Sequence, residues 1–432
     1  MPDLCSYLQE KYQMDPEFCD LARQAEQKAR PEFEQIDETA KINQARVLNA
    51  FREAGISEYH LRDGNGYGYG DPGREGLEEV YALSFGTEAA LVRAQIISGT
   101  HAISLALESI LTPGDLLLSA TGTPYDTLAK IIGVSEAEGR SLCGRGIIYR
   151  EASLTKEGKP DYEKIRKLLM EKPRAVLIQR SRGYSWRPAL SVQEIYDLVR
   201  FIKDHDSNII CFVDNCYGEF VEEREPTHVG VDFMAGSLIK NPGGGLAPSG
   251  GYLVGRRDLV TKAADRLIAP GLGQNMGTNL GLGPLLYQGF FLSPHIVAEA
   301  LKGALFASHL FTILGFETSP APGSRRSDIV QAIKLNDEEG VKAFCRGIQK
   351  ASPVDSRAVP VASSLPGYQD KVIMAGGTFV QGSSIELTAD APMRSPYIVY
   401  LQGCLSYAHA VIGILQGVQE LQCLGKKATA TW

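Results

Sequence analysis

The sequence lacks the patterns that mark several large classes of protein. Its 432 residues contain no long basic run and carry a formal net charge of -7, which disfavours nucleic acid or an anionic membrane surface as the main partner. The N-terminal sequence MPDLCSYLQEKYQMDPEFCD has no apolar core, so we expect no secretory signal. The longest apolar stretch, GALFASHLFTILGF, has about fourteen residues and favours a buried helix over a membrane span.

Metal ligands in a recognisable spacing are also missing. The eight cysteines are scattered without a C-x-x-C pair, and the seven histidines show no H-E-x-x-H or other paired-ligand pattern. We therefore expect no metal centre, and we expect a reduced, cytoplasmic protein. The composition, with 44% hydrophobic and 22% charged residues, is typical of a globular protein, and the length allows two domains.

Short apolar runs alternate with helical patterns through the middle of the chain. Strands buried on both faces are expected at residues 115–120, 175–179, 209–214, 232–237 and 250–255. Three stretches carry apolar residues at three- and four-residue spacing and are expected to be amphipathic helices, at residues 125–139, 161–172 and 191–206. This alternation predicts an α/β fold with right-handed crossovers and a mostly parallel sheet.

The two ends of the chain differ in character from the middle. Residues 4–54 read as helix, and the Gly-, Asn- and Pro-rich stretch at 62–76 reads as a loop. After about residue 290, the stretch at 377–388 is expected to be a strand and the stretch at 397–422 a final helix. We predict an N-terminal helical segment (1–60), a large domain (61–290) and a smaller α+β C-terminal domain (291–432).

Three polar features follow one another along the predicted sheet. Ser98 and Gly99 precede an amphipathic helix whose N-terminal amides and dipole suit a phosphate, although they also fit a simple helix cap. Asp214 ends a buried strand, where open α/β sheets bind ligands, although it also fits a structural cap. Lys240 directly follows the next strand. In a pocket of low dielectric its pKa would be lowered and it could form a Schiff base with an aldehyde, whereas a surface lysine on a glycine-rich turn fits the same pattern.

Together these features match the needs of pyridoxal phosphate. The helix N-terminus would hold the phosphate, Asp214 would pair with the pyridine nitrogen, and Lys240 would hold the aldehyde. Tyr125, just after the strand at 115–120, would stack on the pyridine face, although it also fits core packing. His101 lies beside the proposed phosphate site, where a helix histidine with satisfied hydrogen bonds is the simpler interpretation.

Several motifs resemble those of a known enzyme group. SGTHAISLAL, CFVDNCYGEF and GSLIKNPGGGLAPSGGY are similar to fold-type-I, aspartate-aminotransferase-like pyridoxal-phosphate enzymes. More narrowly, DGNGYGYGDPGREGLE and GTFVQGSSIELTADAPMRSPY resemble the aluminium-resistance-associated proteins, relatives of methionine γ-lyase and cystathionine β-lyase. The resemblance runs from about residue 40 to the end. It implies pyridoxal 5'-phosphate as cofactor, an amino-acid substrate, and a homodimer or homotetramer with shared active sites.

The resemblance also implies roles for single residues. Lys240 would be the Schiff-base lysine and Asp214 the partner of the pyridinium. Ser237, in an S-x-x-K pattern with the lysine, would bind the phosphate. Gly99 and Thr100 would direct backbone amides at the same phosphate.

Two departures from the family pattern concern the substrate. The lyases carry a Tyr-x-Arg loop that reaches into the neighbouring subunit, whereas here Tyr67 and Tyr69 have no arginine at that spacing and Arg74 is a candidate substitute. The lyases bind the substrate carboxylate with a C-terminal arginine, but Glu386 stands near that position here. The candidates for carboxylate binding are Arg394, Arg182 and Arg187.

The expected function is β- or γ-elimination from a sulfur-containing amino acid such as cystathionine, cysteine or methionine. An aminotransferase or a desulfurase-like enzyme with the same cofactor is the first alternative. A nucleotide-binding protein is the second, although GNGYGYG follows no clear strand and precedes no immediate helix, as a dinucleotide fingerprint requires. A cofactor-binding protein without turnover is the third.

Overall fold

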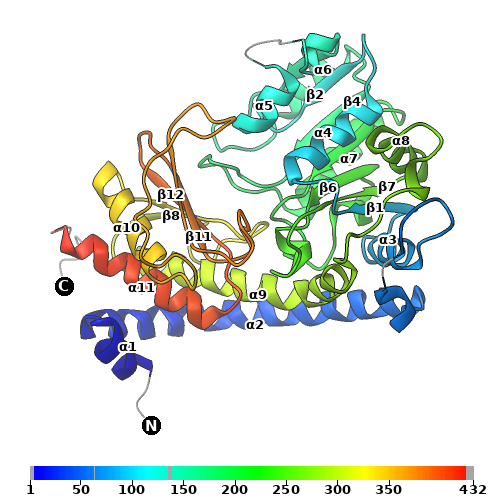
Figure 1. Ribbon diagram of the computed structural model, residues 1–432. Coiled ribbons are helices and arrows are strands. Elements are labelled where there is room, and N and C mark those ends of the chain that lie inside the picture. Colours follow the sequence, from blue (N-terminus) through cyan, green and yellow to red (C-terminus); the bar gives the residue numbers. More distant parts are fainter. Residues whose placement is uncertain (1–3, 63, 135–138, 425–432) are drawn as a thin grey trace. The chain divides into compact units, whose positions relative to one another are not determined.

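The computed structural model describes residues 4–62, 64–134 and 139–424 (Figure 1). The chain divides into two compact units, one formed by residues 41–294 and the other by residues 1–40 together with 295–432. Helices α2 (Pro16–Glu53) and α9 (Gly283–Ile313) contribute residues to both units. Each unit has its own β-sheet and its own buried apolar cluster.

The unit of residues 41–294 contains a seven-stranded sheet in the order β1-β7-β6-β5-β4-β2-β3. Its strands are β1 (Ala89–Arg93), β2 (Leu116–Ser119), β3 (Ile148–Glu151), β4 (Ala175–Gln179), β5 (Ile210–Asp214), β6 (Phe233–Ser237) and β7 (Gly251–Gly255). The pairs from β6 to β3 are parallel, and β7 runs antiparallel to both β1 and β6. The expected mostly parallel α/β sheet is confirmed, with β1 and β3 as strands that the apolar runs did not predict.

Helices join these strands and cover the sheet (Figure 1). They are α3 (Pro72–Ser84), α4 (Gly99–Ile110), α5 (Asp126–Ile132), α6 (Tyr162–Leu169), α7 (Val192–His205) and α8 (Arg257–Leu267). Residues of α4, α5 and α8 share one apolar cluster with the sheet strands. The helix expected over 125–139 ends at Ile132, and residues 135–138 lie outside the described part of the chain.

The second unit contains a five-stranded antiparallel sheet in the order β10-β11-β12-β9-β8. Its strands are β8 (Glu317–Ser319), β9 (Gln331–Lys334), β10 (Val372–Ala375), β11 (Thr388–Pro392) and β12 (Ile398–Gln402). Helices α1 (Leu4–Tyr12), α10 (Glu338–Lys350) and α11 (Tyr407–Cys423) contribute to its core together with parts of α2 and α9. A smaller antiparallel sheet with helices agrees with the expected C-terminal α+β architecture.

Two expectations for the C-terminal region were wrong. Residues 397–422 do not form one helix, because residues 398–402 pair as β12 and α11 begins only at Tyr407. Gly403 lies between these elements with φ of 70°, a conformation that favours glycine and breaks a helix. The strand expected at 377–388 is mostly bends and irregular backbone, and only its last residue belongs to β11. The Glu386 carboxylate accepts hydrogen bonds from the N–H groups of Phe379 at 2.8 Å and Val380 at 2.9 Å, which hold this segment in a bent path.

Helix α9 is longer than its most apolar stretch suggested. By length and composition alone its 31 residues could cross a membrane, but 78% of the most apolar window is buried inside the structure. The core helix of a globular protein has the same properties, so this helix is weak evidence for a membrane span.

Candidate active site

The N-terminus of α4 lies against the end of β6. Ser98 caps the helix, and its side chain accepts a hydrogen bond from the N–H of His101 at 3.1 Å. A Cβ added to Gly99 would lie 3.1 Å from the Cβ of Ser237 and 3.1 Å from the Sγ of Cys216. Ser237 is buried, and its hydroxyl has no hydrogen-bond partner among the described residues. Buried hydroxyls normally have a partner, so the arrangement fits an anion at this helix terminus.

Asp214 ends β5 and is buried. Burial raises the pKa of its carboxyl group, while the N–H of Cys216 at 3.1 Å, the charge of Lys240 and the hydroxyl of Tyr125 oppose that shift. Tyr125 is the N-cap residue of α5 and therefore follows β2. The structure thus brings Asp214, Lys240 and Tyr125 together at the carboxyl ends of three strands, where open α/β sheets bind their ligands.

Lys240 is the N-cap residue of a short 3₁₀ helix, η4 (Asn241–Gly243), in the turn after β6. Its Nζ lies 4.4 Å from the centre of the Tyr217 ring, within the range of a cation–π contact. Burial lowers the pKa of this amine, but Tyr217, Cys216 and Asp214 outweigh burial, and the pKa is raised above its ordinary value. The lowered pKa expected from the sequence was wrong, because these neighbours come from a turn whose path the residue spacing does not show.

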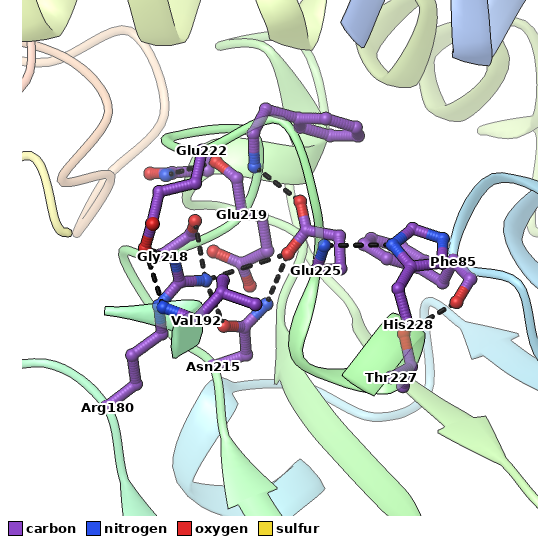
Figure 2. A network of polar contacts seen from close by, with 12 residues as sticks. Phe85, Arg180, Val192, Asn215, Gly218, Glu219, Glu222, Glu225, Thr227 and His228 are labelled. Atoms are coloured by element: carbon purple, nitrogen blue, oxygen red, sulfur yellow. Dashed lines mark hydrogen bonds and ion pairs between the residues drawn. The ribbon is translucent and has the colours of Figure 1, made fainter. Parts of the chain in front are cut away.

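A buried arginine holds the turn that follows β5 (Figure 2). The guanidinium of Arg180 donates hydrogen bonds to the Oδ1 of Asn215 at 2.8 Å, to the carbonyl of Gly218 at 2.9 Å and to Glu222 at 3.0 Å. Glu225 accepts a hydrogen bond from the side chain of Asn215 at 3.1 Å and lies 3.6 Å from the guanidinium. Buried charges are stable only when they are paired and hydrogen-bonded in this way.

The same turn contains left-handed backbone at two bulky residues. Tyr217 has φ of 72° and Phe220 has φ of 61°. Such residues adopt this conformation rarely, and only where the surroundings hold it. The N–H of Phe220 donates to Glu225 at 2.8 Å, and its carbonyl accepts from Asn43 at 2.8 Å. These bonds support the backbone that places the Tyr217 ring against Lys240.

The three arginines considered for carboxylate binding have different surroundings. Arg187 donates to the backbone carbonyl of Gln179, at the end of β4, at 3.0 Å and to that of Pro188 at 3.1 Å. Arg394 belongs to the other unit, is half-exposed and pairs with Asp370 at 2.9 Å. Arg182 is buried in the loop after β4.

The loop that contains Tyr67 and Tyr69 presents both rings to solvent, with exposed fractions of 63% and 89%. Backbone hydrogen bonds join this loop to residues 275–277. Arg74, the suggested substitute for the missing arginine, is buried and donates to the carbonyl of Gly277 at 2.9 Å. Its guanidinium therefore supports the loop from inside.

Comparison with known proteins shows the family of the chain. The family model described as methionine gamma-lyase matches residues 18–422. The chain belongs to this family. Among solved structures, the carbon-sulfur lyase involved in aluminium resistance from Clostridium novyi NT is 47% identical, with a TM-score of 0.93 over 98% of this chain and 100% of that one. The uncharacterized protein YnbB of Bacillus subtilis (strain 168) is 50% identical over 388 residues, which are 90% of this chain and 92% of that protein.

Solved structures of lower sequence identity share the fold of this chain. Cystathionine gamma synthase from Xanthomonas oryzae pv. oryzae is 18% identical, with a TM-score of 0.58 over 82% of this chain and 87% of that one. This likeness concerns the fold alone. It confirms the expected fold-type-I architecture.

The residues of this methionine gamma-lyase family member fit pyridoxal 5'-phosphate. The Ser237 hydroxyl and the first turn of α4, with Gly99 and Thr100, would hold the phosphate. The buried carboxyl of Asp214 would face the pyridine nitrogen, and Lys240 offers an amine for the aldehyde. In the part of the chain that the structure describes, no group of three or more His, Cys, Asp or Glu side chains could hold a metal ion.

Sequence reasoning missed the residues that shape the turn after β5. The motif CFVDNCYGEF was interpreted for Asp214 alone, although Tyr217 and Glu219 belong to it. The available signal was chemical: several acids directly follow a buried strand, and buried acids need a buried cation. Arg180, directly after the buried strand β4, is such a cation.

Proposed function

We propose that this protein is a pyridoxal-phosphate-dependent carbon–sulfur lyase that eliminates a group from Cβ or Cγ of a sulfur-containing amino acid. One observation carries the proposal: Lys240 and Asp214 meet at one sheet edge, and the buried Ser237 hydroxyl without a partner in the described chain lies against the N-terminus of α4. Membership of the methionine gamma-lyase family supports the choice of carbon–sulfur chemistry.

Each residue has a definite task in this proposal. When bound, pyridoxal phosphate supplies an electron sink for the electron pair left at Cα. Asp214 favours a protonated pyridine nitrogen because an ionised carboxylate stabilises a nearby cation. Lys240 takes the α-proton of the substrate as a general base. Ser237 and the amides of the first turn of α4 fix the phosphate, which keeps the substrate within reach of Lys240.

We also propose Arg182 as the residue that binds the substrate carboxylate. Arg182 is buried in the loop after β4. The loop of Arg182 approaches the candidate site, since a Cβ added to Gly183 would lie 3.7 Å from the Cβ of Tyr125. A guanidinium binds a carboxylate with two parallel hydrogen bonds, a geometry that lysine lacks. Arg182→Lys should therefore raise KM for the substrate more than it lowers kcat.

A panel of amino acids tests the reaction type. Cystathionine, cysteine and methionine are incubated with the cofactor-loaded protein, and 2-oxo acid and thiol are measured together. Elimination releases 2-oxo acid and thiol, or hydrogen sulfide where cysteine is the substrate, in equal amounts. Lys240→Ala abolishes both products, while the exposed control Lys262→Ala retains them. Formation of 2-oxo acid only in the presence of an added keto-acid acceptor would establish transamination instead. Alanine formed from cysteine would establish a desulfurase-like reaction.

The proposal includes a homodimer or homotetramer in which the loop of Tyr67 and Tyr69 completes the site of a neighbouring subunit. Two adjacent tyrosines that are 63% and 89% exposed in the single chain support this role. Inactive Lys240→Ala subunits are mixed with inactive subunits that carry Tyr67→Phe and Tyr69→Phe. Random exchange between dimers should restore about one quarter of the sites, because half of the dimers are mixed and each has one intact site. Absence of recovery after verified exchange would rule out shared sites.

A further inference from the structure

Glu219 is a buried carboxyl group that has no task in the proposed reaction. It lies in the turn after β5 with 0% of its surface exposed. Its Oε1 accepts a hydrogen bond from the hydroxyl of Tyr252 at 2.7 Å, and its Oε2 has no hydrogen-bond partner among the residues the structure describes. A buried carboxyl oxygen that lacks a hydrogen bond destabilises the folded state. The surroundings of Glu219 therefore indicate its role.

The carboxyl group of Glu219 packs against β6 at Gly236, the residue before Ser237. A Cβ added to Gly236 would lie 2.5 Å from the Oε1 of Glu219 and 2.8 Å from the hydroxyl of Tyr252. Successive residues of a strand face opposite sides of the sheet, so Gly236 faces away from the side on which Ser237 meets Gly99. Glu219 therefore lies behind the candidate phosphate site, with the backbone of β6 between them.

Glu219 is also joined to the turn that carries Lys240. Its backbone carbonyl accepts a hydrogen bond from the Nδ2 of Asn241 at 2.9 Å. Asn241 directly follows Lys240 and is fully buried. Glu219 thus belongs to the turn after Asp214 and contacts both the strand that ends at Ser237 and the turn that contains Lys240.

Aromatic rings form the compartment around this carboxyl group. Tyr252 of β7 stacks on Phe85 with ring centroids 5.5 Å apart and an interplanar angle of 4°, and Tyr81 of α3 lies 5.8 Å from Tyr252. Rings of this kind suit a neutral acid and disfavour a carboxylate.

Titratable and charged groups around Glu219 lie on α3 and β7 and in the segments that follow β4 and β5. Burial raises the pKa of Glu219 to about 8; the hydrogen bond from Tyr252 opposes this shift, repulsion by Glu225 adds to it, and Arg180 opposes it. Cys216 and Tyr81 also interact electrostatically with Glu219. The group is therefore neutral in the compartment at neutral pH and ionises in mildly alkaline solution.

We propose that Glu219 is a positioning residue that holds the turn of Lys240 against the turn of Asp214, and that ionisation of Glu219 releases this hold. The role of Lys240 in this inference rests on the proposed function. Release of the Lys240 turn from the Asp214 turn requires no bound cofactor. Among the described residues no cation bonds directly to the Glu219 carboxyl group. A carboxylate in this aromatic compartment therefore favours local opening, which exposes the turn that Asn241 now anchors.

The test compares wild type, Glu219→Gln and the control Glu223→Gln, an exposed glutamate of the same loop. The cofactor-free protein is acetylated in a short pulse, and modification of Lys240 is measured by peptide mass spectrometry relative to Lys262. At about pH 6 the three proteins should agree, and at about pH 9 wild type and control should exceed Glu219→Gln at least about threefold. Equal rates for wild type and Glu219→Gln at every pH would overturn the proposal.

Thermal unfolding gives a second readout. The folded protein keeps a proton on Glu219 that the unfolded chain loses above about pH 4.5, so wild-type stability should fall as pH rises from about 4.5 to about 8. Glu219→Gln should lack this part of the slope.

Tyr252→Phe is the second variant, used if Glu219→Gln fails to fold. It removes the hydrogen bond that lowers the pKa of Glu219 and should move the acetylation transition to higher pH. An unmoved transition would overturn the proposal. Failure of the proposed lyase function would appear separately, as no 2-oxo acid from any amino acid.

Discussion

Replacing Arg180 by methionine removes the cation from the buried network after β5 while retaining much of the side-chain volume. The Arg180 side chain is 0% exposed and pairs with Glu222 at 3.0 Å. Removing one partner of a buried ion pair destabilises a protein by about 3–5 kcal/mol, because the other charge stays buried. Glu225 retains Arg46 at 3.6 Å, and Glu222 retains the N–H of Val192 at 2.9 Å. We therefore expect the lower end of this range, about 3 kcal/mol.

Urea unfolding measures this loss. Trp186, in the loop after β4, is a fluorescence reporter in the same unit as Arg180. With an m-value of about 2–3 kcal/mol/M, a loss of about 3 kcal/mol lowers the midpoint by about 1–1.5 M. The matched control is Arg62→Met, whose ion pair with Glu58 at 3.3 Å has side chains that are 72% and 85% exposed. An exposed pair contributes about 0–1 kcal/mol, so the control midpoint should move little.

An equal lowering of the urea midpoint by Arg180→Met and Arg62→Met would contradict this prediction. Such a result would mean that the turn after β5 holds its shape without the buried cation. The left-handed backbone of Tyr217 would then need another explanation.

Three further predictions concern the cofactor. Ser237→Ala should raise the Kd for pyridoxal phosphate about tenfold, since one hydrogen bond to a charged phosphate is lost; an unchanged absorbance titration would exclude Ser237 from the phosphate site. Asp214→Asn should keep the cofactor bound but lower kcat about a hundredfold or more, because an amide stabilises a protonated pyridine nitrogen poorly; wild-type turnover would give Asp214 another role. Cofactor loading should accelerate with rising pH, because the raised pKa of Lys240 leaves its amine protonated at neutral pH. The reactive neutral fraction of the amine grows about tenfold per pH unit below that pKa. A stopped-flow rate that is flat between about pH 6 and about pH 8 would contradict this.

Most of the large sheet, and the edge of it at which the candidate site lies, could be predicted from the sequence alone. Runs such as IICFVD and DFMAGS contain apolar residues on both faces, and this local pattern suits a strand covered on both sides. A polar residue directly after such a run lies at the sheet edge in any parallel α/β arrangement. Asp214 and Lys240 could therefore be recognised before their partners were known.

Features that depend on partners distant in the chain become visible only in the folded protein. The stretch at 397–422 is apolar enough for a helix, but β9 and β11 pair with its first part and make it β12. The sign of the Lys240 pKa shift follows from Tyr217, Cys216 and Asp214, which reach the amine through a turn held by Arg180. Hydrogen bonds and charges act over a few ångströms in space, and the spacing of residues along the chain does not show which of them meet.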